Sequence, residues 1–342
     1  MKPIGFYESL PIENEASLQD VEVAIAPPAG RDLLVRVKAV SVNPVDIKVR
    51  SGGAGKLPEP RILGFDAAGV VEAVGDETSL FQVGDAVFYA GDITRAGSNS
   101  QLQLVDERIV GQKPQSLSFA EAAAVPLTAI TAWEAFFDRM GIPQSPAANA
   151  GKTILIIGGA GGVGSMGIQL AKQVAGLQVV ATASREETAV FAQSLGADHI
   201  INHYQPFQKE FKRIGLSGVE YILCTNKTGN HLPNMVDIIK PQGKIALIMS
   251  AENNQSLNIN PFMSKSVALM WELMFTRPMF QTEDMQKQHD LLNKVSQLLD
   301  TGVLKTTMTE NFGSLSAESL RRAHAKIETG TMMGKLVLEG IA

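Results

Sequence analysis

The chain has 342 residues, of which 45% are hydrophobic and 19% charged, with 31 glycines. At roughly 150 residues per domain, this length predicts two domains that each bury a core, and it excludes a single short binding module. Thirty Lys and Arg residues against 35 Asp and Glu give a formal net charge of −5. No cluster of basic residues is present, so the sequence predicts no nucleic-acid partner.

Cysteine and histidine are scarce and unevenly placed. The one cysteine, Cys224, excludes an intrachain disulfide and indicates a reducing compartment. All five histidines also lie beyond residue 198, so the first 198 residues lack both soft metal ligands. Zinc sites depend on such residues, and we therefore expect no metal there. The sequence has neither a long apolar run nor a signal-peptide pattern, which predicts a cytoplasmic protein with no membrane partner.

The N-terminal part is predicted to be rich in β-strands. From Val21 to about Val110, short apolar runs alternate with Gly, Pro, Asn and Asp. The pattern changes at Ser118, which forms a capping box with Glu121 and predicts the start of an Ala-rich helix. A helical segment at 129–140 and a polar loop follow.

From Lys152 onward, predicted strands and helices alternate. This alternation implies right-handed βαβ crossovers and a parallel, doubly wound sheet. The predicted strands lie at 153–157, 178–183, 199–202, 221–224 and 244–249, and the helices between them end at 174 and 196 or lie around 232–240. Two helices follow, around 291–299 and 316–328, and then a strand at 335–339 that is too distant to belong to this series by sequence alone.

A glycine-rich turn follows the first strand of this series. Its sequence matches G-x-G-x-x-G directly after a strand and directly before a helix, a context that lets the backbone approach a pyrophosphate. The predicted cofactor-binding residues here are Gly159, Gly161, Gly162, Val163 and Gly164. The alternative is a turn that binds nothing.

The end of the second strand predicts which cofactor is bound. About twenty residues after the glycines, folds that prefer NAD usually have Asp or Glu to bind the ribose 2′-hydroxyl. This chain has Ser184 and Arg185. A hydroxyl and a guanidinium can bind a 2′-phosphate, which favours NADP, in its reduced form NADPH. The alternative is that Arg185 is a solvated residue of the following helix.

Together with the glycine turn, the stretches 42–46, 64–71 and 126–132 make the whole chain resemble a medium-chain dehydrogenase/reductase. It resembles the zinc-free quinone oxidoreductase branch, often named zinc-type alcohol dehydrogenase-like. The resemblance implies an α/β fold with a GroES-like β-rich catalytic domain and a Rossmann domain with a parallel sheet, and it accounts for the isolated last strand. It also implies a homodimer that forms by edge-to-edge pairing of Rossmann sheets. The implied bounds are 1–126 for the first part of the catalytic domain, 127–275 for the NADP-binding domain and 276–342 for the return of the chain to the catalytic domain.

The chain departs from the zinc enzymes of that family. Where those have Gly-His-Glu with the histidine on zinc, this chain has Gly64-Phe65-Asp66, and Asn43 lies in the segment where they have a metal cysteine. Zinc stabilises the alkoxide of an unactivated alcohol, so alcohol oxidation is not expected. A quinone or an α,β-unsaturated carbonyl accepts hydride more readily. We therefore expect NADPH-dependent reduction of such a small molecule.

The resemblance also implies catalytic residues. It places Asn43 and Asp46 in a cleft near the nicotinamide. Lys48 stands where many quinone oxidoreductases have a tyrosine five positions after the asparagine, and it could stabilise an oxyanion or donate a proton. The alternative for Lys48 is a solvated surface lysine.

Further positions are implied to contact the cofactor. Thr131 is implied to do so from the start of the Rossmann domain, and His203 or Tyr204, after the third strand, near the adenosine phosphate. Cys224 lies in an apolar strand and is expected to be a packed core thiol. The alternative function is an NADPH-binding redox sensor or structural protein with little turnover.

Overall fold

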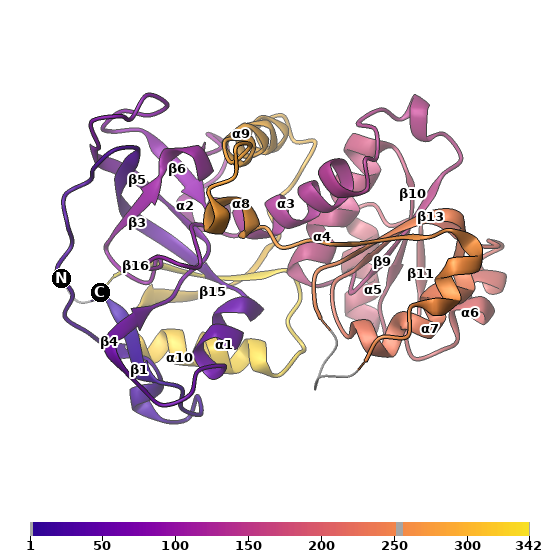
Figure 1. Ribbon diagram of the computed structural model, residues 1–342, viewed down its shortest axis with the longest axis horizontal. Helices are drawn as coiled ribbons and strands as arrows, with labels where there is room; N and C mark the ends of the chain where they lie inside the picture. The colour runs from indigo at the N-terminus through magenta and orange to yellow at the C-terminus, as the bar shows by residue number, and fades with distance from the viewer. Residues whose placement is uncertain (1–2, 251–255, 342) are drawn as a thin grey trace. The chain divides into compact units, whose positions relative to one another are not determined.

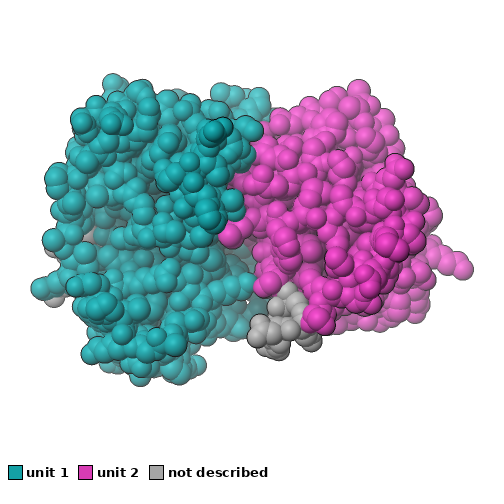
Figure 2. Space-filling view, viewed as in Figure 1, with its two compact units in different colours: residues 1–127, 275–342 teal, residues 128–274 magenta. Residues whose placement is uncertain are grey.

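The computed structural model describes residues 3–250 and 256–341. The chain forms two compact units, shown in Figure 2. Unit 1 consists of Met1–Leu127 and Phe275–Ala342, and unit 2 consists of Thr128–Met274. Unit 1 is therefore built from two separate stretches of chain, whereas unit 2 is built from one. Within the described residues, no helix is long and apolar enough to cross a membrane.

Unit 1 is organised around a mostly antiparallel sheet with the order β15-β16-β3-β5-β6-β8, to which β7 is added beside β3 (Figure 1). The sheet joins the two stretches of unit 1, because β16 pairs antiparallel with β3 and Leu336 lies opposite Val42. The predicted last strand thus belongs to the first unit. The strands are β3 (Asp32–Val42), β5 (Ala67–Val74), β6 (Ala86–Tyr89), β7 (Leu102–Asp106), β8 (Val110–Gln112), β15 (Met308–Leu315) and β16 (Lys335–Ile341).

A smaller sheet and several helices complete unit 1. The predicted capping box at the start of α2 is confirmed, because the Ser118 hydroxyl accepts a hydrogen bond from the Glu121 amide at 3.2 Å and the Glu121 carboxylate accepts one from the Ser118 amide at 2.9 Å. The small sheet has the order β2-β1-β4, from Gln19–Asp20, Ile4–Glu8 and Lys56–Ile62. The helices are α1 (Pro44–Ser51), α2 (Phe119–Ala123), α8 (Thr276–Phe280), α9 (Lys287–Asp300) and α10 (Ala317–Glu328).

Unit 2 is built on a parallel sheet with the order β11-β10-β9-β12-β13-β14 (Figure 1). In chain order the strands lie 3-2-1-4-5-6, the doubly wound arrangement that the alternating pattern predicts. Residues of β9 are buried throughout, as a central strand of such a sheet requires. The strands are β9 (Thr153–Ile157), β10 (Gln178–Thr182), β11 (His199–Ile201), β12 (Val219–Cys224), β13 (Ile239–Leu247) and β14 (Ala268–Trp271).

Helices connect these strands. α3 begins in unit 1 and continues into unit 2, and π-helical turns at 134–139 and 170–175 extend α3 and α4. Cys224 is buried in β12, as predicted, and burial raises the pKa of its thiol to about 11. The thiol is therefore protonated at neutral pH and is a core residue. The helices are α3 (Pro126–Trp133), α4 (Gly162–Gln169), α5 (Glu186–Ser194), α6 (Phe207–Arg213) and α7 (Thr228–Ile238).

Two predicted bounds in unit 2 are wrong. The helix predicted around 232–240 spans Thr228–Ile238, and the strand predicted from Lys244 begins at Ile239. The chain passes directly from helix to strand at Ile238 and Ile239, which are both buried in the core of the unit. The sequence therefore contains no polar turn at this boundary that would mark it.

Strand β14 ends the sheet among the described strands, and its Trp271 side chain is 56% exposed. An exposed apolar edge strand is able to pair with a second copy of the chain. We expect a dimeric mass in light scattering at micromolar concentration, and a monomeric mass for Trp271→Lys. Val190→Lys, on the exposed face of α5, is the matched control and should stay dimeric. A monomeric unmodified protein would contradict the prediction.

Candidate active site

The glycine turn joins β9 to α4, as predicted. Gly158 has a φ of +84°, which favours glycine. A methyl group at Gly164 would lie 2.1 Å from the Gly158 carbonyl oxygen, and one at Gly159 would lie 2.8 Å from the Ala181 side chain. At Gly161 it would meet only the Gly158 oxygen, at 3.4 Å. The fold itself therefore requires glycine at 159 and 164, whereas Gly161 borders open space.

The open space lies at the N-terminus of α4. Gly161 is the N-cap residue, and Gly162 and Val163 form the first helical turn. The first intrahelical bond of this turn is donated by the Ser165 amide to the Gly161 carbonyl at 2.8 Å, so the preceding amides point out of the helix end. Such amides and the helix dipole favour a phosphate. The residues present fit the pyrophosphate of a dinucleotide.

Ser184 and Arg185 follow β10 and are exposed. The Arg185 amide donates to the Thr188 hydroxyl at 3.2 Å, which fixes the start of α5. The guanidinium Nε lies 3.3 Å from a carboxylate oxygen of Glu187, and the Arg185 side chain is 42% exposed. Glu187 was not among the predicted site residues. A bound 2′-phosphate would share the guanidinium with this carboxylate, which lies at the solvent-exposed start of the helix.

His203 and Tyr204 follow β11, the neighbour of β10 in the parallel sheet, so they lie at the same carboxyl edge as Ser184 and Arg185. The two rings lie at a centroid distance of 4.3 Å with their planes tilted by 49°, and Tyr204 is 73% exposed. Burial and the nearby Lys227 lower the pKa of His203. The histidine is therefore neutral at pH 7, and the exposed tyrosine ring is the part of this pair that a ligand reaches first.

Thr131 lies in α3, and its side chain is buried. It is the sixth residue of the helix, in the part of α3 that belongs to unit 2.

Asn43 caps α1 and is only 1% exposed. Its side-chain amide donates to an Asp66 carboxylate oxygen at 2.9 Å and to the Ser41 carbonyl at 3.3 Å. Its side-chain oxygen accepts a hydrogen bond from the Lys335 ammonium. Both amide hydrogens therefore have protein acceptors in this structure. A side chain bonded in this way positions its neighbours.

Asp46 is buried beside this group. One of its carboxylate oxygens accepts from the Asn43 backbone amide at 2.8 Å and the other from the Gly64 amide at 3.0 Å. Burial raises its pKa to about 7, although these backbone bonds and the Lys335 charge oppose the shift. Asp46 thus ties the start of α1 to the segment that begins at Gly64.

No role was predicted for Lys335, the first residue of β16. Its side chain is 4% exposed, and its ammonium donates to Asp66 at 2.9 Å, to the Val42 carbonyl at 3.2 Å and to the Asn43 side chain. Burial raises the pKa of Asp66, and the Lys335 charge opposes this rise. No local pattern indicates this contact, because only the pairing of β16 with β3 brings Lys335 to the end of β3.

We call Asn43, Asp46, Asp66 and Lys335 the buried cluster. It joins two of the predicted catalytic residues to two residues that had no predicted role. The third predicted catalytic residue, Lys48, is exposed on α1, two positions after Asp46.

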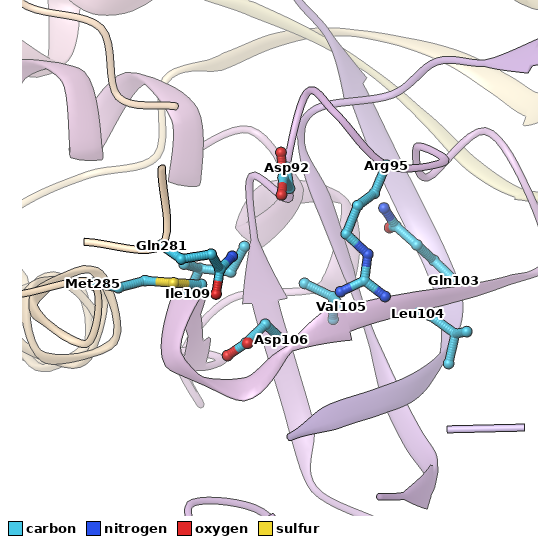
Figure 3. Close-up of a pocket in the computed structure, with 9 residues that line it drawn as sticks. All are labelled: Asp92, Arg95, Gln103, Leu104, Val105, Asp106, Ile109, Gln281 and Met285. Carbon is cyan, nitrogen blue, oxygen red and sulfur yellow. The ribbon is translucent and has the colours of Figure 1, made fainter. Parts of the chain in front are cut away.

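A small cavity lies elsewhere in unit 1 and has a volume of ≈ 10 Å³, which is room for about one water molecule. Figure 3 shows its lining. Arg95 is held by two hydrogen bonds to Asp32, at 2.8 and 2.7 Å, and the buried side-chain oxygen of Gln103 has no partner among the described residues. The cavity is too small for an organic substrate. It is lined by Asp92, Arg95, Gln103, Leu104, Val105, Asp106, Ile109, Gln281 and Met285.

The buried cluster does not fit a zinc ion. Zinc requires Cys, His or carboxylate ligands, whereas Phe65 offers an aromatic ring and Asn43 an amide that is already bonded. The Asp66 carboxylate is bonded to an ammonium. Across residues 3–250 and 256–341, no group of three or more His, Cys, Asp or Glu side chains is placed to hold a metal ion.

Comparisons with known proteins place the chain in a family. It matches a family model described as an alcohol dehydrogenase GroES-like domain over residues 29–134 and one described as a zinc-binding dehydrogenase over residues 162–294. A zinc-type alcohol dehydrogenase-like protein of Staphylococcus epidermidis is 42% identical over 338 residues, which cover 99% of both chains. The 2-methylene-furan-3-one reductase of Solanum lycopersicum is 30% identical over 350 residues, which cover 98% of this chain and 77% of that protein.

A solved structure agrees with these matches. The crystal structure of a Rhizobium etli protein assigned as a zinc-dependent alcohol dehydrogenase is 48% identical, with a TM-score of 0.93, and the match covers 100% of this chain and 98% of that one. The predicted fold class, a GroES-like domain with a Rossmann domain, is confirmed. Several of these names refer to zinc, for which the buried cluster lacks ligands. The chain belongs to the medium-chain dehydrogenase/reductase superfamily of oxidoreductases.

Proposed function

We propose that this protein is an NADPH-dependent reductase that transfers hydride to a quinone or an α,β-unsaturated carbonyl without zinc. The observation that carries the proposal is the buried cluster, in which Asp66 is bonded to the Lys335 ammonium and does not lie among metal ligands. Alcohol oxidation relies on a Lewis acid to stabilise an alkoxide, and the cluster supplies none. Conjugated acceptors need less stabilisation of the developing negative charge, because that charge is delocalised.

The cofactor residues support the choice of a nicotinamide dinucleotide. When bound, NADPH supplies the hydride. Gly161 and the first turn of α4 would hold its pyrophosphate, and Ser184 and Arg185 its 2′-phosphate. Tyr204 would lie against the adenosine end. The reductase from Solanum lycopersicum has a name that describes an unsaturated ketone, which agrees with the proposed substrate class.

Residues on and near α1 would stabilise and protonate the oxygen of the acceptor. Hydride addition to a conjugated carbonyl leaves an oxyanion that must take up a proton. Lys48 carries an exposed ammonium that can stabilise this oxyanion and donate the proton. Asn43 and Asp46 act by positioning α1, since their side chains are bonded inside the protein.

The test is turnover with a panel of acceptors. We expect the protein to consume NADPH with quinones and alkenals, which absorbance follows. The kcat/KM for oxidation of simple alcohols with NADP⁺ should be at least about a hundredfold lower than the kcat/KM for these acceptors, in line with the value of one Lewis-acid or oxyanion contact. Elemental analysis of dialysed protein should find no stoichiometric zinc, and chelators should leave activity unchanged. Comparable alcohol oxidation, or zinc that is lost together with activity, would contradict the proposal, and binding of NADPH without turnover would favour a redox sensor.

Lys48→Met is expected to lower kcat for quinone and enone reduction by about 10²- to 10³-fold, the usual cost of one oxyanion donor. Rates must be measured at saturating NADPH to separate turnover from binding. Lys38→Met, at an exposed position of β3, is the matched control and should retain activity. If both variants are as active as the unmodified protein, Lys48 is a solvated lysine.

Arg185→Ala is expected to weaken NADPH binding by about 1–3 kcal/mol, because a charge-assisted bond to the 2′-phosphate is lost. NADH lacks this phosphate, so its dissociation constant should not change. Titration of each cofactor into each protein gives the comparison, and Lys209→Ala, an exposed lysine of α6, controls for the loss of a surface charge. Equal or tighter binding of NADH by the unmodified protein would overturn the predicted cofactor preference.

A further inference from the structure

The Lys335 ammonium is fully bonded within the protein. It has three hydrogens, and the structure offers three acceptors: the Val42 carbonyl at 3.2 Å, Asp66 at 2.9 Å and the Asn43 side-chain oxygen. A substrate oxygen would therefore have to displace one of these partners. The lysine is placed to hold the cluster together and not to donate to a ligand.

Asp66 links the cluster to α3. One of its carboxylate oxygens accepts from Asn43 and Lys335, and the other accepts from the Leu127 amide at 2.7 Å. α3 begins at Pro126, which has no N–H, so Leu127 provides the first amide of the helix. A carboxylate at this end of a helix is favoured by the helix dipole. Asp66 thus anchors the first turn of the helix that contains Thr131.

The anchor depends on the charge of Lys335. Asp66 is fully buried, and a buried carboxylate is costly unless a cation and hydrogen bonds compensate it. Lys335 is the cation bonded to it. A metal ion could balance the same carboxylate, but a second cation within about 3 Å of the ammonium would be repelled strongly at the low dielectric of the interior.

We propose that Lys335 is a positioning residue: a fixed internal cation that favours the charged form of Asp66, supports the bond from Asp66 to the first turn of α3 and occupies the place that a metal ion would need. It acts on cofactor binding through Asp66 and α3. The proposal rests on the proposed function for its cofactor, NADPH, whose binding can be titrated in the absence of any acceptor and therefore separately from turnover.

The decisive variant is the neutral pair Lys335→Met/Asp66→Asn. The Asn amide oxygen still accepts from Leu127, and neither buried charge remains. We expect the pair to bind NADPH within about threefold of the unmodified protein, whereas Lys335→Met alone, which leaves Asp66 without its cation, should raise the dissociation constant and KM of NADPH at least about tenfold, with a smaller change in kcat. Lys326→Met, a lysine on the surface of α10, is the control.

The outcomes separate direct from indirect action. A neutral pair that folds but still binds NADPH weakly, or that regains binding but keeps a low kcat, would overturn the proposal, because the lysine charge would then act on cofactor or substrate itself. Failure of the neutral pair to fold would also count against it. If Lys335→Met alone does not fold, restored binding in the neutral pair still supports it. Turnover of the unmodified protein tests the proposed function separately.

Discussion

Gly164→Ala is expected to prevent folding of unit 2, whereas Gly161→Ala is expected to leave the fold intact. Gly161→Ala should instead weaken NADPH binding about tenfold to a hundredfold, because a methyl group at this position would block the close approach of the pyrophosphate. The added carbon at Gly164 would lie 2.1 Å from a backbone oxygen that cannot move aside, and the one at Gly161 would lie 3.4 Å from the same oxygen. The two variants thus distinguish a glycine that the fold requires from a glycine that pyrophosphate binding requires.

Thermal unfolding and NADPH titration give the readouts. Both tryptophans, Trp133 and Trp271, lie in unit 2, so their fluorescence follows the unit that the substitutions affect. Gly151→Ala, at a position with open space around it but a φ of +74°, is the control for general backbone strain, and it should bind NADPH normally. Normal binding by Gly161→Ala would show that the turn holds no pyrophosphate.

Asp66→Ala is expected to destabilise unit 1 by about 3–5 kcal/mol, since it leaves the Lys335 ammonium buried without its carboxylate. Asp66→Asn keeps one acceptor oxygen, which can bond the Leu127 amide, and should cost less than Asp66→Ala. Far-UV circular dichroism in denaturant reports both units, whereas tryptophan fluorescence reports unit 2, so a loss confined to unit 1 should appear in the first signal before the second. If Asp66→Ala lowers the free energy of unfolding no more than Asp20→Ala, a substitution of an exposed aspartate, the ion pair contributes little to stability.

Local sequence patterns predicted the architecture of unit 2 but not all its strands. The apolar run at 153–157 is buried throughout in β9, and the glycines after it form a strand-turn-helix junction, because both features depend on neighbouring residues. The short strand β14 was not predicted. Its Ala268 and Trp271 are exposed, so neither the alternation of a half-buried strand nor the run of a buried one is present.

The site was predicted less completely than the fold. The pattern around Asn43 predicts a site in this segment, but nothing in the pattern indicates that both side-chain amide hydrogens are bonded to Asp66 and Ser41. Such orientations depend on which strands pair, and Lys335 reaches the cluster only because β16 pairs with β3. Contacts of this kind follow from the topology and leave no local signal in the sequence.

The pairing of β16 with β3 also constrains the order in which the two units fold. Asn43 and Lys335 are separated by 292 residues, and a contact across so long a loop forms only after much chain entropy is lost. Unit 2, in contrast, is one continuous stretch, Thr128–Met274. A chain that emerges from the ribosome N-terminus first can therefore complete unit 2 while the earlier-made half of unit 1 still waits for β16. During that interval Asp66 has no lysine partner, so the buried cluster is among the last parts of the molecule to form.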